Sequence, residues 1–256
     1  MNTKILQDKV AIVTGAGMGM GAATARLFAE AGARVVVADV NESAGRQIVE
    51  EIVAAGGEAF FQRANVSVAA DVEALVAAAV SRYGRLDVAV NNAAVTPDAK
   101  PLAEMDEADF DRVIAVDLKG VALCLKYELA QMIRQGQGGS IINIGSVSSF
   151  RPQPTNGAYV AAKHGVIGLT KVAALENGGH NIRVNAVAPG AIDTPMLRGA
   201  LDAMKVSEAE YAPTRSLLNR FGAPTEVAQA SLWLASDLSS YVTGSTIHVD
   251  AGYANR

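Results

Sequence analysis

Cysteine, aromatic residues and charged residues are all scarce in this chain of 256 residues. The single cysteine, Cys124, has no partner for a disulfide, and no Cys and His cluster has metal-ligand spacing, so we expect no metal site. Charged residues make up 19%, the net charge is −4, and no Lys and Arg cluster suggests nucleic acid or an anionic membrane as partner. The N-terminus lacks an apolar signal core, and no apolar run approaches the roughly 18 residues of a membrane span, so we expect a cytoplasmic protein.

Hydrophobic residues, in contrast, make up 50% of the chain, and their order predicts the fold. Short runs rich in Val and Ile alternate with longer alanine-rich segments of helical pattern, and nearly continuous Val and Ile runs are typical of a parallel sheet covered on both faces. We therefore predict one α/β domain over residues 1–256, with a doubly wound, mostly parallel seven-stranded sheet and helices on both faces. The expected strands are 9–15, 33–39, 58–66, 86–92, 139–146, 181–189 and 245–252, and the expected helices include 20–32, 70–84 and 108–135.

The first expected strand runs into a glycine-rich stretch, TGAGMGMG at residues 14–21, which then opens a helix. Glycine lets the backbone approach a pyrophosphate closely, and the positive end of the helix attracts its charge. A plain tight turn between strand and helix is the alternative interpretation. If the stretch binds a dinucleotide, the predicted contacts are Gly15, Gly17, Met18, Gly19, Met20 and Gly21.

Asp39 ends the second expected strand, where it bears on the choice of cofactor. A carboxylate there can accept hydrogen bonds from both ribose hydroxyls of an adenosine, and it would repel a 2′-phosphate. Met18 and Val40, where an Arg could have neutralised that phosphate, are both apolar. This pattern favours NAD over NADP, unless Asp39 merely ends the strand or caps the helix that begins near Asn41.

A third candidate site lies in the stretch GAYVAAKHGV, residues 157–166. Tyr159 and Lys163 stand at i and i+4, on the same face of the expected helix, and Ser146 ends a strand at the sheet edge where open α/β folds hold ligands. Removing hydride from an alcohol leaves a proton for a base to take, and the charges of Lys163 and of an oxidised nicotinamide are sufficient to favour the ionised tyrosine. Each pattern alone is common in structural helices, but the combination is specific.

Together these motifs resemble the short-chain dehydrogenase/reductase family over essentially the whole chain. The matching pieces are TGAGMGMG (14–21), Asp39, NNAA (91–94), Ser146, YVAAK (159–163) and PGAIDTP (189–195). The resemblance implies a Rossmann-type fold in which Tyr159 is the general acid/base, Ser146 holds the substrate oxygen, and Lys163 binds the nicotinamide ribose. It also implies cofactor contacts at Val40, Asn65, Val66, Asn91, Ala93, Tyr159, Lys163, Pro189, Gly190, Ile192 and Thr194.

Three positions depart from the family pattern. Asp117 stands in the segment VIAVDLKG where the family usually has Asn, at a position that belongs to its proton relay, and we keep it as the fourth catalytic candidate. Ala94 replaces a usual Gly, and Asn65 replaces a common Asp at the adenine. Both look tolerable, because Ala adds one methyl group and Asn keeps a carbonyl.

These observations predict an NAD-dependent oxidoreductase that interconverts a secondary alcohol and a ketone. One alternative is a nucleotide-binding protein that has lost turnover, with Asp117 as its support, and another is an NADPH-dependent carbonyl or acyl-thioester reductase, which Asp39 disfavours. We expect a neutral, fairly apolar substrate, although an Arg151 or Arg198 clamp for an anion stays open. The predicted substrate contacts are Ser146, Val147, Ser148, Tyr159, Gly190, Met196 and Leu197.

Residues 196–218 are the expected substrate lid. Leu197, Leu201 and Met204 form an apolar stripe there, which ordinary helix packing explains equally well. Elsewhere, Cys124 is expected in the core or at an interface, and Trp233 in the core. His164 points about 100° away from Lys163 on its helix, which argues against a catalytic role.

We also expect a homotetramer. The helices at 108–135 and 159–176 are richer in Ala, Val and Leu than one sheet face requires, and the resemblance implies that they form a four-helix bundle between subunits.

Overall fold

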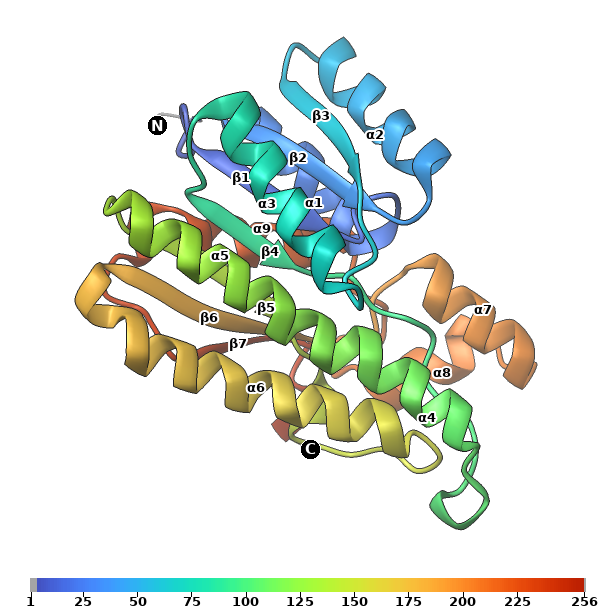
Figure 1. Ribbon diagram of the computed structural model, residues 1–256. Helices are drawn as coiled ribbons and strands as arrows, with labels where there is room; N and C mark the ends of the chain where they lie inside the picture. The colour runs from blue at the N-terminus through green and yellow to red at the C-terminus, as the bar shows by residue number, and fades with distance from the viewer. Residues whose placement is uncertain (1–3, 256) are drawn as a thin grey trace.

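The computed structural model describes residues 4–255, which fold around a parallel sheet with the strand order β3-β2-β1-β4-β5-β6-β7 (Figure 1). All six strand pairings are parallel, which confirms the predicted α/β class. Each predicted run contains one strand, and the central strands β1 and β4 are buried along their whole length. The strands are β1 Val10–Thr14, β2 Arg34–Asp39, β3 Glu58–Arg63, β4 Val88–Asn91, β5 Gly139–Ile144, β6 Ile182–Pro189 and β7 Thr246–Val249.

The strand order predicts where on the sheet a ligand would bind. Strands β1 to β3 extend to one side and β4 to β7 to the other, so the order reverses between β1 and β4, which are paired at the centre. Open α/β sheets bind ligands at the carboxyl ends of strands beside such a reversal. The glycine-rich loop follows β1 and the NNAA segment follows β4, so these two motifs meet there.

Helices cover both faces of the sheet. Aliphatic side chains that point to the two faces of the sheet form two separate cores, and three helices pack on each core. On one face lie α1 Gly19–Glu30, α2 Glu42–Ala54 and α9 Pro224–Ala235, and on the other lie α3 Ala69–Tyr83, α5 Val121–Gln135 and α6 Gly157–Asn177. The α5 and α6 helices run side by side in Figure 1. The helices α7 Pro195–Met204 and α8 Glu208–Arg215 lie past the ends of the strands.

The helix predicted at 108–135 has an interruption in the middle. It begins as α4 Glu107–Ile114, passes through a π-helical segment, η2 Ala115–Gly120, and continues as α5. A π-helical turn inside an α-helix is rare and is frequently found at functional sites. Asp117, the departure from the family pattern, lies in this turn and is completely buried.

Two of the other expectations can be compared with the structure. Cys124 is buried in α5, as predicted. The prediction that Trp233 lies in the core was wrong, since 37% of it is exposed. The buried stripe of α9 runs through Val227, Ser231 and Leu234, and Trp233 falls outside it.

Within residues 4–255, no helix has the length and apolar character needed to cross a membrane. The same residues bring together no group of three or more His, Cys, Asp or Glu side chains that could hold a metal ion.

Candidate active site

The glycine-rich loop leads directly into α1, and the N-cap side chain accepts no hydrogen bond from the first amides of that helix. Gly19 begins the helix with a φ of +57°, a conformation that side chains disfavour, and a Cβ on Gly21 would lie 2.2 Å from the carbonyl oxygen of Gly15. Met18 is the N-cap residue, and its side chain accepts no hydrogen bond from the helix. A helix start with free N–H groups and no room for side chains fits a pyrophosphate.

Asp39 is part of this loop rather than a cap of α2. Its Oδ2 accepts a hydrogen bond from the amide of Gly17 at 2.8 Å, and its Oδ1 accepts one from Asn41 N at 2.9 Å. Asn41 itself caps α2 by accepting from Ala44 N at 3.1 Å. The carboxylate therefore lies at the carboxyl end of β2, beside the loop that the sequence predicts to hold the cofactor.

The NNAA segment after β4 is bonded to the glycine-rich loop, but through Asn92 rather than Asn91. The Nδ2 of Asn92 donates to the carbonyls of Thr14 at 2.9 Å and Gly15 at 3.1 Å, and Thr14 Oγ1 accepts from the amides of Asn92 at 3.0 Å and Ala93 at 3.1 Å. Thr14 and Asn92 were missed as site residues, although both stand in the motifs quoted above. Asn91 points the other way, into the core.

The side chain of Asn91 belongs to a buried polar network. Its Nδ2 donates to Glu128 Oε2 and to Asn143 Oδ1, both at 3.0 Å, and Asn143 Nδ2 donates to Thr170 Oγ1 at 3.0 Å. Asn91 can therefore face a cofactor only through its backbone. Burial raises the pKa of Glu128 to about 7, although the hydrogen bond from Asn91 opposes this.

The side chains of two other cofactor candidates are also engaged within the protein. The Oδ1 of Asn65 accepts from Ser67 N at 3.1 Å and from Ser67 Oγ at 2.8 Å, so the carbonyl expected at the adenine is already bonded. Val66 is buried and packs with Val72 and Cys124. Like Asn91, it could contact a cofactor only through its backbone.

The segment predicted to hold the nicotinamide lies close to the glycine-rich loop. It leaves β6 at Pro189, and Thr194 caps α7 by accepting from Leu197 N at 3.3 Å. A Cβ built on Gly19 would lie 3.4 Å from the methyl group of Thr194. Gly190 has no space for a side chain, because a Cβ there would lie 2.8 Å from the Cα of Asp250.

Ser146, Tyr159 and Lys163 meet at the carboxyl end of β5. Lys163 Nζ lies 5.4 Å from the centre of the Tyr159 ring and donates to the carbonyl of Ile144 at 3.2 Å. Ser149 Oγ accepts from Ser146 N at 3.3 Å and donates to the carbonyl of Lys163 at 2.7 Å, which links Ser146 to α6. The three residues thus stand on two adjacent elements that are hydrogen-bonded to each other.

Asp117 forms a buried ion pair with Lys163. Its Oδ2 lies 3.3 Å from Lys163 Nζ and has no hydrogen-bond partner among the described residues, while its Oδ1 accepts from Val95 N at 2.9 Å. Burial disfavours the charged ammonium, but the negative charge of Asp117, with a contribution from Tyr159, outweighs it and raises the pKa of Lys163. The lysine at this site is therefore held in its protonated form.

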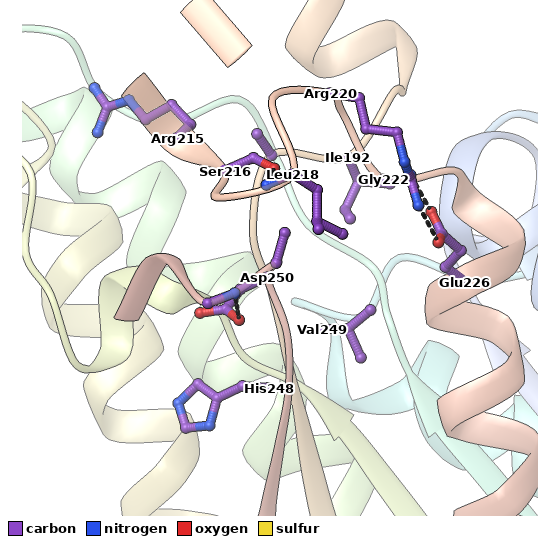
Figure 2. Close-up of a pocket in the computed structure, with 13 residues that line it drawn as sticks. Ile192, Arg215, Ser216, Leu218, Arg220, Gly222, Glu226, His248, Val249 and Asp250 are labelled. Carbon is purple, nitrogen blue, oxygen red and sulfur yellow. Dashed lines mark hydrogen bonds and ion pairs between the residues drawn. The ribbon is translucent and has the colours of Figure 1, made fainter. Parts of the chain in front are cut away.

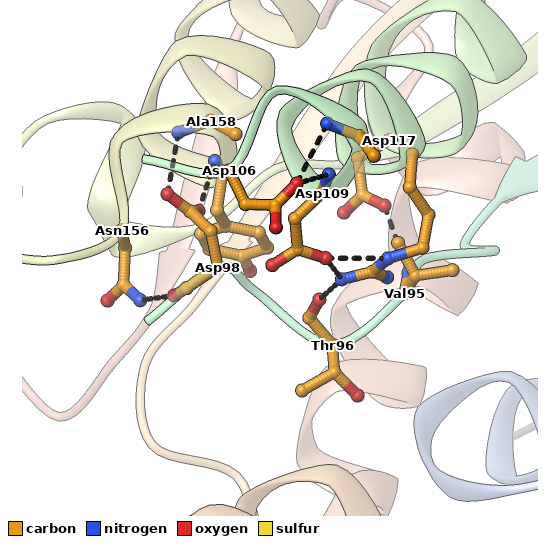
Figure 3. A network of polar contacts seen from close by, with 11 residues as sticks. Val95, Thr96, Asp98, Asp106, Asp109, Asp117, Asn156 and Ala158 are labelled. Carbon is orange, nitrogen blue, oxygen red and sulfur yellow. Dashed lines mark hydrogen bonds and ion pairs between the residues drawn. The ribbon is translucent and has the colours of Figure 1, made fainter. Parts of the chain in front are cut away.

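The loop after β4 is attached to both helices of this site (Figure 3). Asp98 Oδ2 accepts from Ala158 N and its Oδ1 from Tyr159 N, each at 3.1 Å. Arg112 in α4 donates to the carbonyl of Thr96 at 3.0 Å. No sequence motif points to Asp98, because its partners lie 60 residues or more further along the chain.

On the substrate side, Val147 and Ser148 are buried beside Ser146, and Met196 is 38% exposed. The two candidate arginine clamps are engaged elsewhere. Arg151 donates to the carbonyl of Tyr253 at 3.0 Å, and Arg198 pairs with Asp193 at 2.7 Å and Glu208 at 2.8 Å. Neither arrangement favours an anionic substrate.

A cavity of about 320 Å³ lies next to this site (Figure 2). It shares Ile192 with the predicted nicotinamide segment, and its wall includes Arg215, Ser216, His248 and Asp250. None of Ser146, Tyr159 and Lys163 lines this cavity.

Comparison with known proteins identifies the family. A family model described as enoyl-(acyl carrier protein) reductase matches residues 15–254. The short-chain dehydrogenase/reductase astE of Aspergillus oryzae is 52% identical over 96% of this chain and 95% of its own. The 2,5-dichloro-2,5-cyclohexadiene-1,4-diol dehydrogenase of Sphingobium indicum is 44% identical over 97% of this chain and 98% of its own.

A solved structure agrees. The crystal structure of 3-ketoacyl-(acyl-carrier-protein) reductase from Brucella melitensis complexed with NADH has a TM-score of 0.89 and 32% identity, covering 97% of this chain and 99% of that one. The fold and these relatives define an enzyme of the oxidoreductase class. The chain belongs to the short-chain dehydrogenase/reductase family, which confirms the resemblance seen in its motifs.

Proposed function

We propose that this protein is an NAD(H)-dependent dehydrogenase that interconverts a neutral, cyclic secondary alcohol and its ketone. The observation that supports it most is the group formed by half-buried Tyr159 and the buried ion pair of Lys163 and Asp117. The uncapped start of α1 is suited to a dinucleotide. Residues of the glycine-rich loop, Asp39 and the segment 189–194 would hold the cofactor. The nicotinamide, when bound, supplies or accepts the hydride.

The chain's own residues move the proton. Tyr159 acts as the general acid/base, taking the hydroxyl proton of an alcohol or returning it to a ketone oxygen. The ammonium of Lys163, 5.4 Å from the ring centre, favours the ionised phenol by its charge. The hydroxyl of Ser146 donates to the substrate oxygen and orients it toward Tyr159.

Asp39 supports the preference for NAD over NADP. Its carboxylate is bonded to Gly17 and Asn41 and would repel a 2′-phosphate, and Met18 and Val40 beside it are exposed apolar residues. Arg63 is the register partner of Asp39 on β3 and is the basic residue that could weaken this preference. We expect kcat/KM with NADH to exceed that with NADPH by at least about tenfold. Equal rates with the two cofactors would refute the assignment.

The cyclic substrate rests on two observations. Both candidate anion clamps, Arg151 and Arg198, are engaged within the protein, and the Sphingobium relative carries the name of a dehydrogenase for a cyclic diol. A 3-ketoacyl-thioester reductase is the second candidate, because the Brucella structure carries that name. The test measures nicotinamide absorbance with cyclohexanols, cyclohexanones and an acetoacetyl thioester. Turnover of the thioester without any of the cyclic compounds would favour the second candidate.

A further inference from the structure

The helix that carries Tyr159 and Lys163 does not supply its own N-terminal cap. Asn156 precedes α6, but its side chain makes no capping hydrogen bond and donates instead to the backbone carbonyl of Asp98 at 2.5 Å. The first intrahelical bond of α6 is made by Val160 N, so the amides of the residues before it need other acceptors.

Asp98 supplies those acceptors from another part of the chain. Its carboxylate accepts from Ala158 N and from the amide of Tyr159 itself, both at 3.1 Å, and only 8% of Asp98 is exposed. A buried carboxylate at a helix N-terminus makes charge-assisted hydrogen bonds and interacts favourably with the helix dipole. The backbone position of Tyr159 is thus set by a loop 60 residues earlier in the sequence.

The same loop also contacts Asp117 (Figure 3), which pairs with Lys163. Val95 N donates to Asp117 Oδ1 at 2.9 Å, and Asp117 Oδ2 faces Lys163 Nζ at 3.3 Å. Between Val95 and Asp98, the carbonyl of Thr96 accepts from Arg112, which is itself paired with Asp109. Residues 95–98 are therefore held to both α6 and η2.

We propose that Asp98 is a positioning residue for Tyr159: it fixes the start of α6, and its charge offsets the positive end of the helix next to the phenol. This rests on the proposed role of Tyr159 as the general acid/base. Loss of Asp98 would let the first turn of α6 shift, and would leave the positive helix end uncompensated, which favours the ionised phenol.

The chain offers a matched control in Asp106. Asp106 also caps a helix, since its Oδ1 accepts from Ala108 N at 3.0 Å and Asp109 N at 3.3 Å at the start of α4. Unlike Asp98 it is exposed and precedes its own helix, and α4 carries none of Tyr159, Lys163 and Asp117. Asp98→Ala should lower kcat of alcohol oxidation by about tenfold or more while KM for NAD+ changes less than about twofold, because a modest displacement of a reacting group is costly. The rising limb of its pH profile should also move to lower pH. Asp106→Ala should change neither quantity.

The proposal fails if Asp98→Ala lowers kcat no more than Asp106→Ala does, or if kcat falls without a shift of the pH profile. Should Asp98→Ala not fold, Asp98→Asn is judged against Asp106→Asn by the same two readouts, since Asn has nearly the same shape without the charge. The variant Tyr159→Phe tests the proposed function independently of the role of Asp98. If that variant keeps full turnover, the proposed function is wrong, whatever Asp98 does.

Discussion

Asp117 is the residue at which the motifs of this chain depart from the pattern they resemble, inside the proposed reaction centre, and its contacts explain how a carboxylate fits there. The carboxylate keeps the hydrogen bond from Val95 N that an Asn side chain could also accept, and its second oxygen pairs with Lys163. The carboxylate differs from an Asn side chain in its negative charge, which acts on Lys163 and Tyr159. In the proposed mechanism the ammonium of Lys163 favours the ionised form of Tyr159, and a carboxylate 3.3 Å from that ammonium offsets part of this effect.

The variant Asp117→Asn should therefore shift the rising limb of the alcohol oxidation profile to lower pH. A neighbouring opposite charge changes a pKa by about 1–3 units, so the shift should be at least about one pH unit. The measurement is kcat against pH between about pH 6 and 10, a range set by the ordinary pKa values of the groups involved. Tyr159→Phe is the control, which should lose turnover at every pH and still bind NADH. Superimposable profiles for wild type and Asp117→Asn would refute the electrostatic argument.

Glu128 is a second buried carboxyl group, and its ionisation bears on stability rather than on catalysis. Its pKa is raised to about 7, mainly because it is buried. Between about pH 4.5 and 7 the unfolded chain ionises Glu128 while the folded protein keeps its proton, so the unfolded state binds fewer protons and stability falls as pH rises. Above about pH 7 this loss should be constant.

Glu128→Gln should remove this pH dependence and stabilise the protein at pH 8. The gain relative to wild type should be near zero at pH 4.5 and rise to about 3 kcal/mol, at about 1.4 kcal/mol per unit of pKa. A Gln amide could also donate to Asn91 Oδ1, which has no partner among the described residues. Urea unfolding at pH 5 and pH 8, with the exposed Glu50→Gln as control, measures the difference. A gain of equal size at both pH values would contradict this account.

At the level of elements, the sheet was predictable because the strands β1, β2, β4, β5 and β6 carry buried Val or Ile side chains. That Tyr159 and Lys163 lie close together was predictable, because the single motif YVAAK holds both. Contacts between distant segments were not, and the Asp98 cap on α6 is one example. The side-chain direction of Asn91 could not be predicted either, because it depends on Glu128 and Asn143 from two other elements.

The α7 and α8 helices make the lid prediction testable. Leu201 is 4% exposed and packs with Ala212 and Phe221, whereas Met204, on the same stripe, is 48% exposed. Leu201→Ala should cost about 2–4 kcal/mol of local packing and loosen α7 from α8. If these helices cover the substrate, KM for the alcohol should rise several-fold while KM for NAD+ stays within about twofold.

Met204→Ala is the matched control for this experiment, because it removes an exposed side chain from the same stripe, whereas Leu201→Ala removes a buried one. It should leave both KM values unchanged. If Leu201→Ala lowers the melting temperature but leaves KM for the alcohol unchanged, the stripe serves ordinary helix packing, and residues 196–218 are not a lid.

At the scale of the whole molecule, exposed apolar side chains gather on opposite faces of the sheet. On α6, Val172 is 51% and Leu175 is 86% exposed. At the end of α9 and just after it, Trp233 is 37%, Leu238 is 69% and Tyr241 is fully exposed. Contiguous exposed apolar patches mark interaction sites, and we expect these two groups of side chains to act as such patches.

Two separate patches predict a tetramer rather than a dimer. Each patch can form one self-complementary interface across a two-fold axis. One such interface gives a dimer, and two of them, on different two-fold axes, give a closed tetramer. Light scattering at micromolar concentration should give four times the chain mass of 26.5 kDa. Leu175→Glu should reduce the mass to that of a dimer through the remaining Tyr241 patch, and Tyr241→Asp should leave a dimer through the α6 patch, since each variant buries a charge in one interface only. The double variant should be a monomer. A wild-type protein that is already monomeric would refute the assembly, and a single variant that goes directly to monomer would show that the two patches form one interface.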